Sequence, residues 1–133
     1  MNPRGFASCL AAVACGSVLA LLGGSASASG SYTCTITGTP GADFLGGSGG
    51  RDVICGLGGN DVIAAGGGND VLNGGSGNDK LEGDAGRDLM LGGPGRDTFL
   101  AYDGYADTID GGSGYDGGWA DQRDHWRNVE NLK

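Results

Sequence analysis

Nine aspartates recur at a nearly constant spacing along this 133-residue sequence. The spacing is nine residues except for one step of ten, and the positions are Asp43, Asp52, Asp61, Asp70, Asp79, Asp88, Asp97, Asp107 and Asp116. Carboxylates are hard oxygen ligands, and Ca²⁺ takes about six to eight such oxygens in a tolerant geometry. Mg²⁺ fits less well, because it requires tight octahedral geometry and retains its waters. Transition metals find few ligands, since the chain has one His and four Cys.

The aspartates belong to a nine-residue unit in which we number the aspartate as position six. Position four is Gly in all units but one, where Tyr105 replaces it, and position one is Gly except at Ala65 and Tyr102. Position eight is apolar in the first eight units, as Leu45, Ile54, Ile63, Leu72, Leu81, Met90, Phe99 and Ile109, and becomes Gly118 in the last. The high Gly content and negative charge also suit a disordered tail. Disordered acidic sequence has no reason to keep an apolar residue in phase with an aspartate, so the repeat favours an ordered chain when metal is bound.

Each unit predicts a glycine turn followed by a short strand. Glycines at positions one and four allow positive φ and close approach of neighbouring turns. Position seven is often β-branched, and position eight points inward while its two neighbours point outward. Two units then make one coil of eighteen residues, and successive coils pair as parallel strands. Alternate aspartates therefore line the same side of the stack: Asp43, Asp61, Asp79 and Asp97 on one edge, and Asp52, Asp70, Asp88 and Asp107 on the other.

The unit at residues 74–82, with the sequence GGSGNDKLE, resembles the repeat G-G-x-G-x-D-x-U-x of the RTX (repeats-in-toxin) family, where U is a large apolar residue. The resemblance extends over about residues 38–118. It implies an all-β fold, namely a parallel β-roll or right-handed β-solenoid, with Ca²⁺ ions between stacked turns. It also implies that the aspartates share each ion with backbone carbonyls, for which we expect Gly66, Gly68, Gly74, Gly75, Gly77, Gly83 and Gly86.

The predicted core is thin, because each unit buries one large apolar side chain and must order nine residues. Stacked carboxylates also repel one another, so bound ions would supply stability that the core lacks. The alternative is a metal-free solenoid whose aspartates only form turns. Pairs of adjacent aspartates give three sites on each edge, and the units at 66–73, 74–82 and 83–91 fit the repeat best. Residues 100–106 break it, so the sites that include Asp107 and Asp116 are the least secure.

The first 28 residues are typical of a secretory signal peptide. Arg4 precedes an apolar run from Phe6 to Leu22, and Ala26-Ser27-Ala28 fits the cleavage motif. A membrane anchor is the alternative, although the run is short and interrupted, and we expect no stable membrane insertion. Residues 29–37 are interpreted as an N-terminal cap strand, 38–118 as the roll, and 119–133 as a C-terminal cap. Trp119, Trp126, Val129 and Leu132 would cover the last coil.

Cys34 and Cys55 are the two cysteines outside the predicted signal. Export would permit a disulfide between them, and their separation of 21 residues is one coil plus three. Such a bond would fix the N-terminal strand to the first coil. Two free thiols and an intermolecular bridge remain open as alternatives.

The charge pattern excludes several functions. The chain has 16 acids and 8 bases, a net charge of −8, and no Lys/Arg cluster, so we expect no nucleic-acid binding. No nucleophile–base pair or known catalytic motif occurs, which argues against an enzyme. The leading hypothesis is a secreted, extracellular calcium-binding protein whose folding is driven by the ions. The alternative is a calcium-rigidified adhesin or interaction module with a protein or glycan partner that the sequence does not identify.

Overall fold

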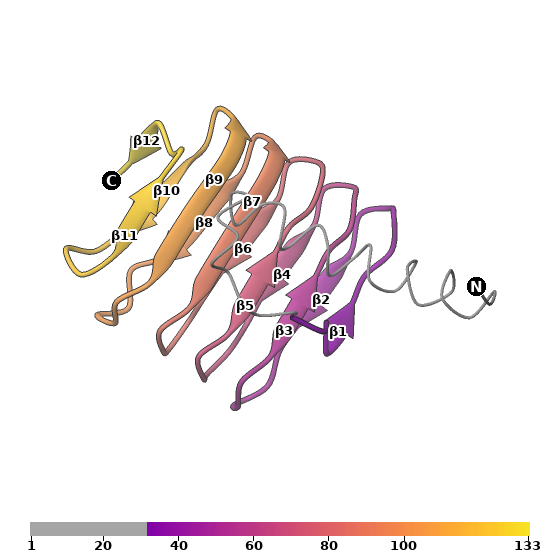
Figure 1. Ribbon diagram of the computed structural model, residues 1–133, viewed down its shortest axis with the longest axis horizontal. Helices are drawn as coiled ribbons and strands as arrows, with labels where there is room; N and C mark the ends of the chain where they lie inside the picture. The colour runs from indigo at the N-terminus through magenta and orange to yellow at the C-terminus, as the bar shows by residue number, and fades with distance from the viewer. Residues whose placement is uncertain (1–31) are drawn as a thin grey trace, which may run out of the picture.

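The computed structural model describes residues 32–133 as a stack of short parallel strands in two sheets (Figure 1). One six-stranded sheet has the order β1-β3-β5-β7-β9-β11, and the other has the order β12-β10-β8-β6-β4-β2. The strand bounds are β1 Ile36–Thr37, β2 Phe44–Gly46, β3 Val53–Cys55, β4 Val62–Ala64, β5 Val71–Asn73, β6 Lys80–Glu82, β7 Leu89–Gly95, β8 Thr98–Ala101, β9 Thr108–Gly114, β10 Gly117–Ala120, β11 His125–Arg127 and β12 Asn131–Leu132. The predicted all-β parallel solenoid is confirmed. The predicted signal at 1–28 and the start of the N-terminal strand at 29–31 lie outside the described residues.

The strand register shows that one coil contains eighteen residues. Val53 of β3 pairs with Val71 of β5, and Val62 of β4 pairs with Lys80 of β6. The step grows to nineteen where Leu89 of β7 pairs with Thr108 of β9, because the insertion in the repeat falls between them. Consecutive units therefore alternate between the two sheets, and their turns alternate between the two edges of the roll (Figure 1).

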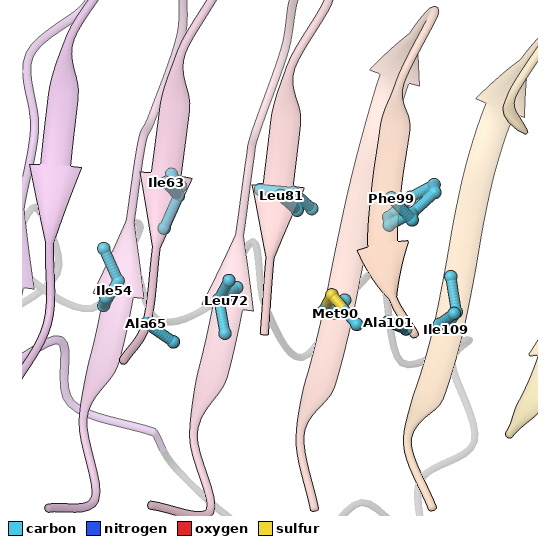
Figure 2. Close-up of a cluster of buried hydrophobic side chains, with 9 residues drawn as sticks. All are labelled: Ile54, Ile63, Ala65, Leu72, Leu81, Met90, Phe99, Ala101 and Ile109. Carbon is cyan, nitrogen blue, oxygen red and sulfur yellow. The ribbon is translucent and has the colours of Figure 1, made fainter. Parts of the chain in front are cut away.

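The space between the two sheets is filled by the position-eight side chains (Figure 2). Ile54, Ile63, Leu72, Leu81, Met90, Phe99 and Ile109 are all completely buried there. Ala65 and Ala101 fill the remaining inward space, and Leu45 lies partly buried against the same cluster. The predicted core residues are thus confirmed, and the core is a single row of side chains from each sheet. This thin core leaves the turns and their aspartates at the two edges.

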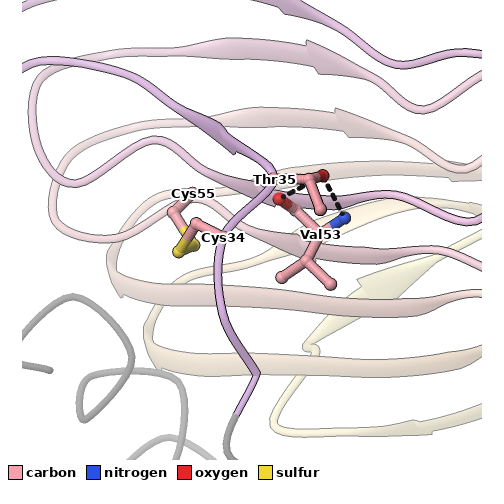
Figure 3. The surroundings of a disulfide bond; sticks show 4 residues. All are labelled: Cys34, Thr35, Val53 and Cys55. Carbon is pink, nitrogen blue, oxygen red and sulfur yellow. Dashed lines mark hydrogen bonds between the residues drawn. A yellow bond between two sulfur atoms is a disulfide. The ribbon is translucent and has the colours of Figure 1, made fainter. Parts of the chain in front are cut away.

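A second apolar cluster lies on the other face of the sheet that starts with β1. Val53, Cys55, Val71 and Leu91 are buried there, with Cys34 packed against them. Figure 3 shows the disulfide between Cys34 and Cys55, whose Cα atoms are 6.0 Å apart. Beside it, the Thr35 hydroxyl accepts a hydrogen bond from the Val53 amide at 3.0 Å. The disulfide joins the chain before β1 to β3 in the next coil, as predicted from the sequence.

The C-terminal segment continues the roll as a further coil. Strand β11 pairs with β9 and β12 pairs with β10, so residues 119–133 add strands to both sheets. Val129 packs against the core, but Trp119 and Trp126 remain 47% and 51% exposed. The tryptophans therefore do not cover the end as expected, because their strands extend the sheets rather than fold across them. In the part of the chain that the structure describes, no helix is long and apolar enough to span a membrane.

Candidate metal centre

The position-six aspartates form two continuous hydrogen-bonded columns, one on each edge of the roll. In each column, the backbone amide of an aspartate donates to Oδ1 of the aspartate one coil later. Asp61 donates to Asp79 at 2.8 Å on one edge, and Asp70 donates to Asp88 at 2.8 Å on the other. Asp97 continues the first column to Asp116, and Asp88 continues the second to Asp107. The two predicted edges are therefore confirmed, and Asp116 joins the first of them.

The second carboxylate oxygens of these columns have no hydrogen-bond partner although they are buried. Within the described residues this holds for Oδ2 of Asp61, Asp70, Asp79, Asp88, Asp97, Asp107 and Asp116. An unpaired buried carboxylate oxygen is unfavourable, because it has lost water without gaining a donor. A cation is the partner that suits a row of such oxygens, since no protein donor approaches them.

The raised pKa values of these aspartates also show that their charged form is unfavourable where it is buried. Burial raises the pKa of Asp97 and Asp107 to about 7 and that of Asp88 to about 6, and the neighbouring carboxylates add to each shift. The pKa of Asp61, Asp70, Asp79 and Asp116 is also raised, again chiefly by burial. Hydrogen bonds from the preceding coil oppose the shift but do not cancel it. The columns hold charge at a place where the protein alone disfavours it.

At most position-one glycines, Oδ2 of the unit's own aspartate and a carbonyl oxygen of the next coil pack closely against the glycine. A Cβ on Gly74 would lie within 3.0 Å of both Asp79 Oδ2 and the Gly92 carbonyl oxygen. The same pair of oxygens, one carboxylate and one carbonyl, surrounds Gly38, Gly47, Gly56, Gly92 and Gly111. These contacts bring a carboxylate oxygen and a carbonyl oxygen from two successive coils close together, and both are ligand types that suit Ca²⁺. The repeat favours glycine here because a Cβ would clash with both oxygens, although Ala65 occupies the same position in the fourth unit.

The carbonyl ligands predicted from the family resemblance have different surroundings. The Gly74 carbonyl lies beside Asp61 Oδ2, where both pack against Gly56. The Gly66 carbonyl accepts a hydrogen bond from the Ala85 amide at 3.0 Å. The carbonyls of Gly68, Gly75 and Gly77 lie against glycines of the next coil. As ligands, these and the carbonyls of Gly83 and Gly86 stay predictions. Carbonyls beside a position-six Oδ2 in the same way, which the sequence analysis did not predict, are those of Gly56, Ala65, Gly92, Gly111 and Asn128.

The first two turns have a different geometry. The Ser48 amide and hydroxyl both donate to Asp52 Oδ2, at 2.6 and 2.8 Å, and Thr39 gives Asp43 the same two donors. Hydrogen bonds from the Ser48 amide and then its hydroxyl lower the pKa of Asp52. Asp43 and Asp52 were predicted as ligands like the rest, but their second oxygens are supplied by their own turns.

A backbone difference accompanies these donors. From the third unit on, position two has positive φ in every unit but the eighth, as at Gly75 with 94°. Leu57 and Asp84 adopt it as well, at 79° and 59°. Thr39 and Ser48 do not, so their amides turn toward their own aspartate. A residue with positive φ instead directs its amide elsewhere, and the Gly75 amide donates to the Gly92 carbonyl. In the first two turns the position-two residue thus satisfies Oδ2 within the turn, whereas the eighth turn, whose Asp103 also lacks positive φ, leaves Oδ2 of Asp107 unpaired.

Several residues of the columns lie outside the repeat that the sequence revealed. The Asp107 amide donates to Asp124 Oδ1 at 2.9 Å, and the Asp116 amide donates to Glu130 at 2.7 Å. These acids take the place of position six in the last coil. Their offsets of 17 and 14 residues depart from eighteen, so the period alone could not find them. Position-five Asn residues add a second ladder, in which Asn60, Asn69 and Asn78 each accept an amide of the next coil.

The family comparison agrees with this geometry. The RTX calcium-binding nonapeptide repeat, a model of four copies, matches residues 35–63 and again 64–99. Residues 35–99 belong to the RTX calcium-binding repeat family. Neither the curated proteins nor the solved structures yielded a match to this chain. The RTX match ends before the insertion near Ala101, whereas the columns of acids continue past it to Glu130.

Proposed function

We propose that this chain is a secreted calcium-binding RTX protein whose folding is driven by Ca²⁺ held between stacked turns. The unpaired, buried Oδ2 atoms of seven position-six aspartates carry this proposal. Each would give one oxygen to an ion, and carbonyls such as that of Gly74 would give others. The ion supplies positive charge in a place that the protein fills only with oxygens. We assign the chain no catalytic activity, since the matched family is a binding repeat.

The thin core explains why ion binding and folding are coupled. One row of apolar side chains per sheet must stabilise two edges of stacked carboxylates. A ligand that binds only the folded chain stabilises it in proportion to RT ln(1 + [L]/Kd) at each site. With several sites, folding becomes a steep function of the calcium concentration. The chain would therefore be unfolded where calcium is scarce and folded where it is abundant.

Circular dichroism of residues 29–133, titrated with CaCl₂ and then with EDTA, tests this function. We expect the β signal to appear with calcium and to disappear with the chelator, while MgCl₂ at the same concentration has little effect. Elemental analysis of the folded protein should find several Ca²⁺ ions per chain. A full β signal in EDTA, unchanged by added calcium, would refute the proposal.

Secretion is part of the proposal and rests on the sequence of the first 28 residues. Cleavage after Ala28 would leave a chain that begins at Ser29. The disulfide between Cys34 and Cys55 supports an oxidising compartment, because such bonds are rare in reducing ones. Mass spectrometry of the protein from the culture medium of its own cells should find this N-terminus. Intact protein retained inside the cells would argue against secretion.

Exposed aromatic side chains favour an interaction module as the second candidate. Tyr102 is 79% exposed, and it borders a hollow shared with Trp126, Gln122 and Arg123 at the C-terminal end. Exposed aromatic rings beside polar groups are common at sites that bind proteins or sugars. A pull-down and a glycan array, each with calcium and with EDTA, test this. A partner captured only with calcium would support a role beyond ion binding.

A further inference from the structure

The turn of the eighth unit, residues 102–106, departs from every other turn after the first two. Its Gly104 amide donates to Asp121 Oδ2 at 2.8 Å, and the Gly104 carbonyl accepts from Arg123 at 2.9 Å. Within the described chain, no backbone hydrogen bond joins this turn to the turn of the sixth unit, one coil earlier. In the regular column the corresponding bonds exist, as from the Ala85 amide to the Gly66 carbonyl. The turn is therefore held by the last coil and not by the preceding one.

This departure changes the oxygens around Gly83, the position-one glycine of the sixth unit. A Cβ there would meet Asp88 Oδ2 at 2.6 Å, and its next nearest atoms, at 3.4 Å, also belong to Asp88. The carbonyl of the next coil that faces the six other position-one glycines is missing from this group. The regular donor set of one carboxylate and one carbonyl is thus incomplete at this place.

The carboxylate of Asp103 lies close to Asp88 and Asp107. Asp88, Asp103 and Asp107 each place one oxygen so that all three lie within 4.8 Å of one another. The Oδ2 atoms of all three are buried and have no hydrogen-bond partner, and Asp107 is fully buried. The Tyr105 amide donates to Asp103 Oδ1 at 2.8 Å, which fixes the Asp103 carboxylate in the turn. The charge of Asp103 also contributes to the raised pKa of both Asp88 and Asp107.

We propose that Asp88, Asp103 and Asp107 bind one Ca²⁺ together, with Asp103, at position two of the displaced turn, as a carboxylate ligand in place of a backbone carbonyl. The proposal rests on the calcium-binding function above and adds a ligand to it. A site with three carboxylates has more negative charge than a site with two, so it binds calcium more tightly and repels itself more strongly without metal. The insertion near Ala101 thereby converts one regular site into a site of higher affinity.

The test compares Asp103→Asn with Asp84→Asn in the chain 29–133. Asp84 is also a position-two aspartate near Asp88, but it is exposed and its Oδ2 accepts a hydrogen bond from the Gly66 amide at 3.2 Å. Asn keeps an oxygen acceptor in both variants and removes one charge. The calcium midpoint of folding is measured by circular dichroism, and the ions per chain by elemental analysis after dialysis against buffered calcium.

We expect Asp103→Asn to raise the calcium midpoint by on the order of tenfold and to lose one ion at intermediate calcium, while Asp84→Asn shifts it less than about twofold. In EDTA the effect should reverse, with Asp103→Asn retaining more β structure than wild type because one repelling charge is gone. A variant that folds poorly in both conditions would show a structural role only and would overturn the proposal, as would equal midpoints for the two variants. If the wild-type chain binds no calcium, the proposed calcium-binding function itself is refuted, and not only the site of three aspartates.

Discussion

The first two turns of the roll and the turns after them differ in how the Oδ2 atom of the position-six aspartate is hydrogen-bonded. Ser48 provides an amide and a hydroxyl to Asp52 within one turn, so that carboxylate is complete without any other group. The equivalent oxygen of Asp79 is buried with no partner, and the amide of Gly75 at position two donates to the Gly92 carbonyl instead. In these two turns the position-two residue makes the difference between a carboxylate that is fully hydrogen-bonded within its own turn and one that is left for a cation. The roll begins with the first kind and continues with the second.

The largest expected effect comes from Asp79→Asn compared with Asp43→Asn. Asp79 Oδ2 is unpaired, and its Oδ1 also accepts the Asp61 amide, so the change weakens a site in the middle of a column. We expect the calcium midpoint of folding to rise on the order of tenfold or more. Asp43 has donors from Thr39, and its replacement should move the midpoint little. Calcium titration by circular dichroism measures both, and equal shifts would remove the distinction between the two kinds of turn.

Gly77→Ala and Gly50→Ala compare position four in the two kinds of turn. Gly77 has φ of 134°, and a Cβ there would clash with the Gly59 carbonyl of the preceding coil. Around Gly50 a Cβ would meet only the Ser48 hydroxyl at 3.9 Å. We expect Gly77→Ala to cost about 2–3 kcal/mol and Gly50→Ala to be near neutral. Urea unfolding at saturating calcium measures the difference, and similar losses would contradict it.

The pH dependence should also separate the two kinds of carboxylate. Asp97 and Asp107 have a folded-state pKa of about 7, well above the value of 3.8 for a free side chain. The folded chain therefore binds protons that the unfolded chain releases, so metal-free stability falls as the pH rises from about 4 to 7. Asp52 has a lowered pKa, so its contribution is lost only below about pH 4.

Circular dichroism in EDTA at pH 5 and pH 8 measures this effect. We expect more β structure at pH 5, because protons then neutralise the columns in place of calcium. Calcium binding should weaken over the same range, since protons compete for the same oxygens. Higher metal-free β content at pH 8 would show that burying the charged carboxylates is not what chiefly destabilises the metal-free fold.

The smallest expected effect is that of Ser48→Ala. The change removes the hydroxyl that donates to Asp52 and keeps the backbone amide that also donates. We expect a loss of about 0.5–1.5 kcal/mol at saturating calcium, the usual value of one hydrogen bond. Ser113→Ala is the control, since Ser113 is exposed and lies near the end of β9. Thermal unfolding of both variants compares them, and equal melting temperatures would show that the hydroxyl adds nothing.

The period of nine was enough to predict the architecture. It assigned the inward residues from Leu45 to Ile109 and divided the aspartates between two edges, because a strand period of two and a coil of two units leave little freedom. The period could not predict the turn conformation. Leu57 and Asp84 adopt positive φ although neither is Gly, and only the fit between stacked coils imposes it.

Residues outside the period were the ones that the sequence did not reveal. Asp103 lies in a turn that an insertion has displaced, and Asp124 and Glu130 lie in a segment without the glycine pattern. Their positions depend on contacts between segments, as when Asp121 and Arg123 hold Gly104. Trp119 and Trp126 are more exposed than predicted for a related reason. A hydrophobic cap is a general expectation for a solenoid end, while this chain adds another coil instead.

The columns of aspartates have a direction. Each position-six amide donates to an acid one coil later in the chain, from Asp43 to Asp61 at the start and from Asp116 to Glu130 at the end. A chain that is made or threaded through a pore from its N-terminus thus always has a newest coil whose aspartate amides lack acceptors. The columns are complete only with Asp124 and Glu130, so cutting the C-terminus leaves position-six amides without acceptors, whereas cutting the N-terminus leaves all the remaining position-six amides paired. The hydrogen-bonded columns therefore run in one direction, and the acids of the C-terminal segment accept their last amides.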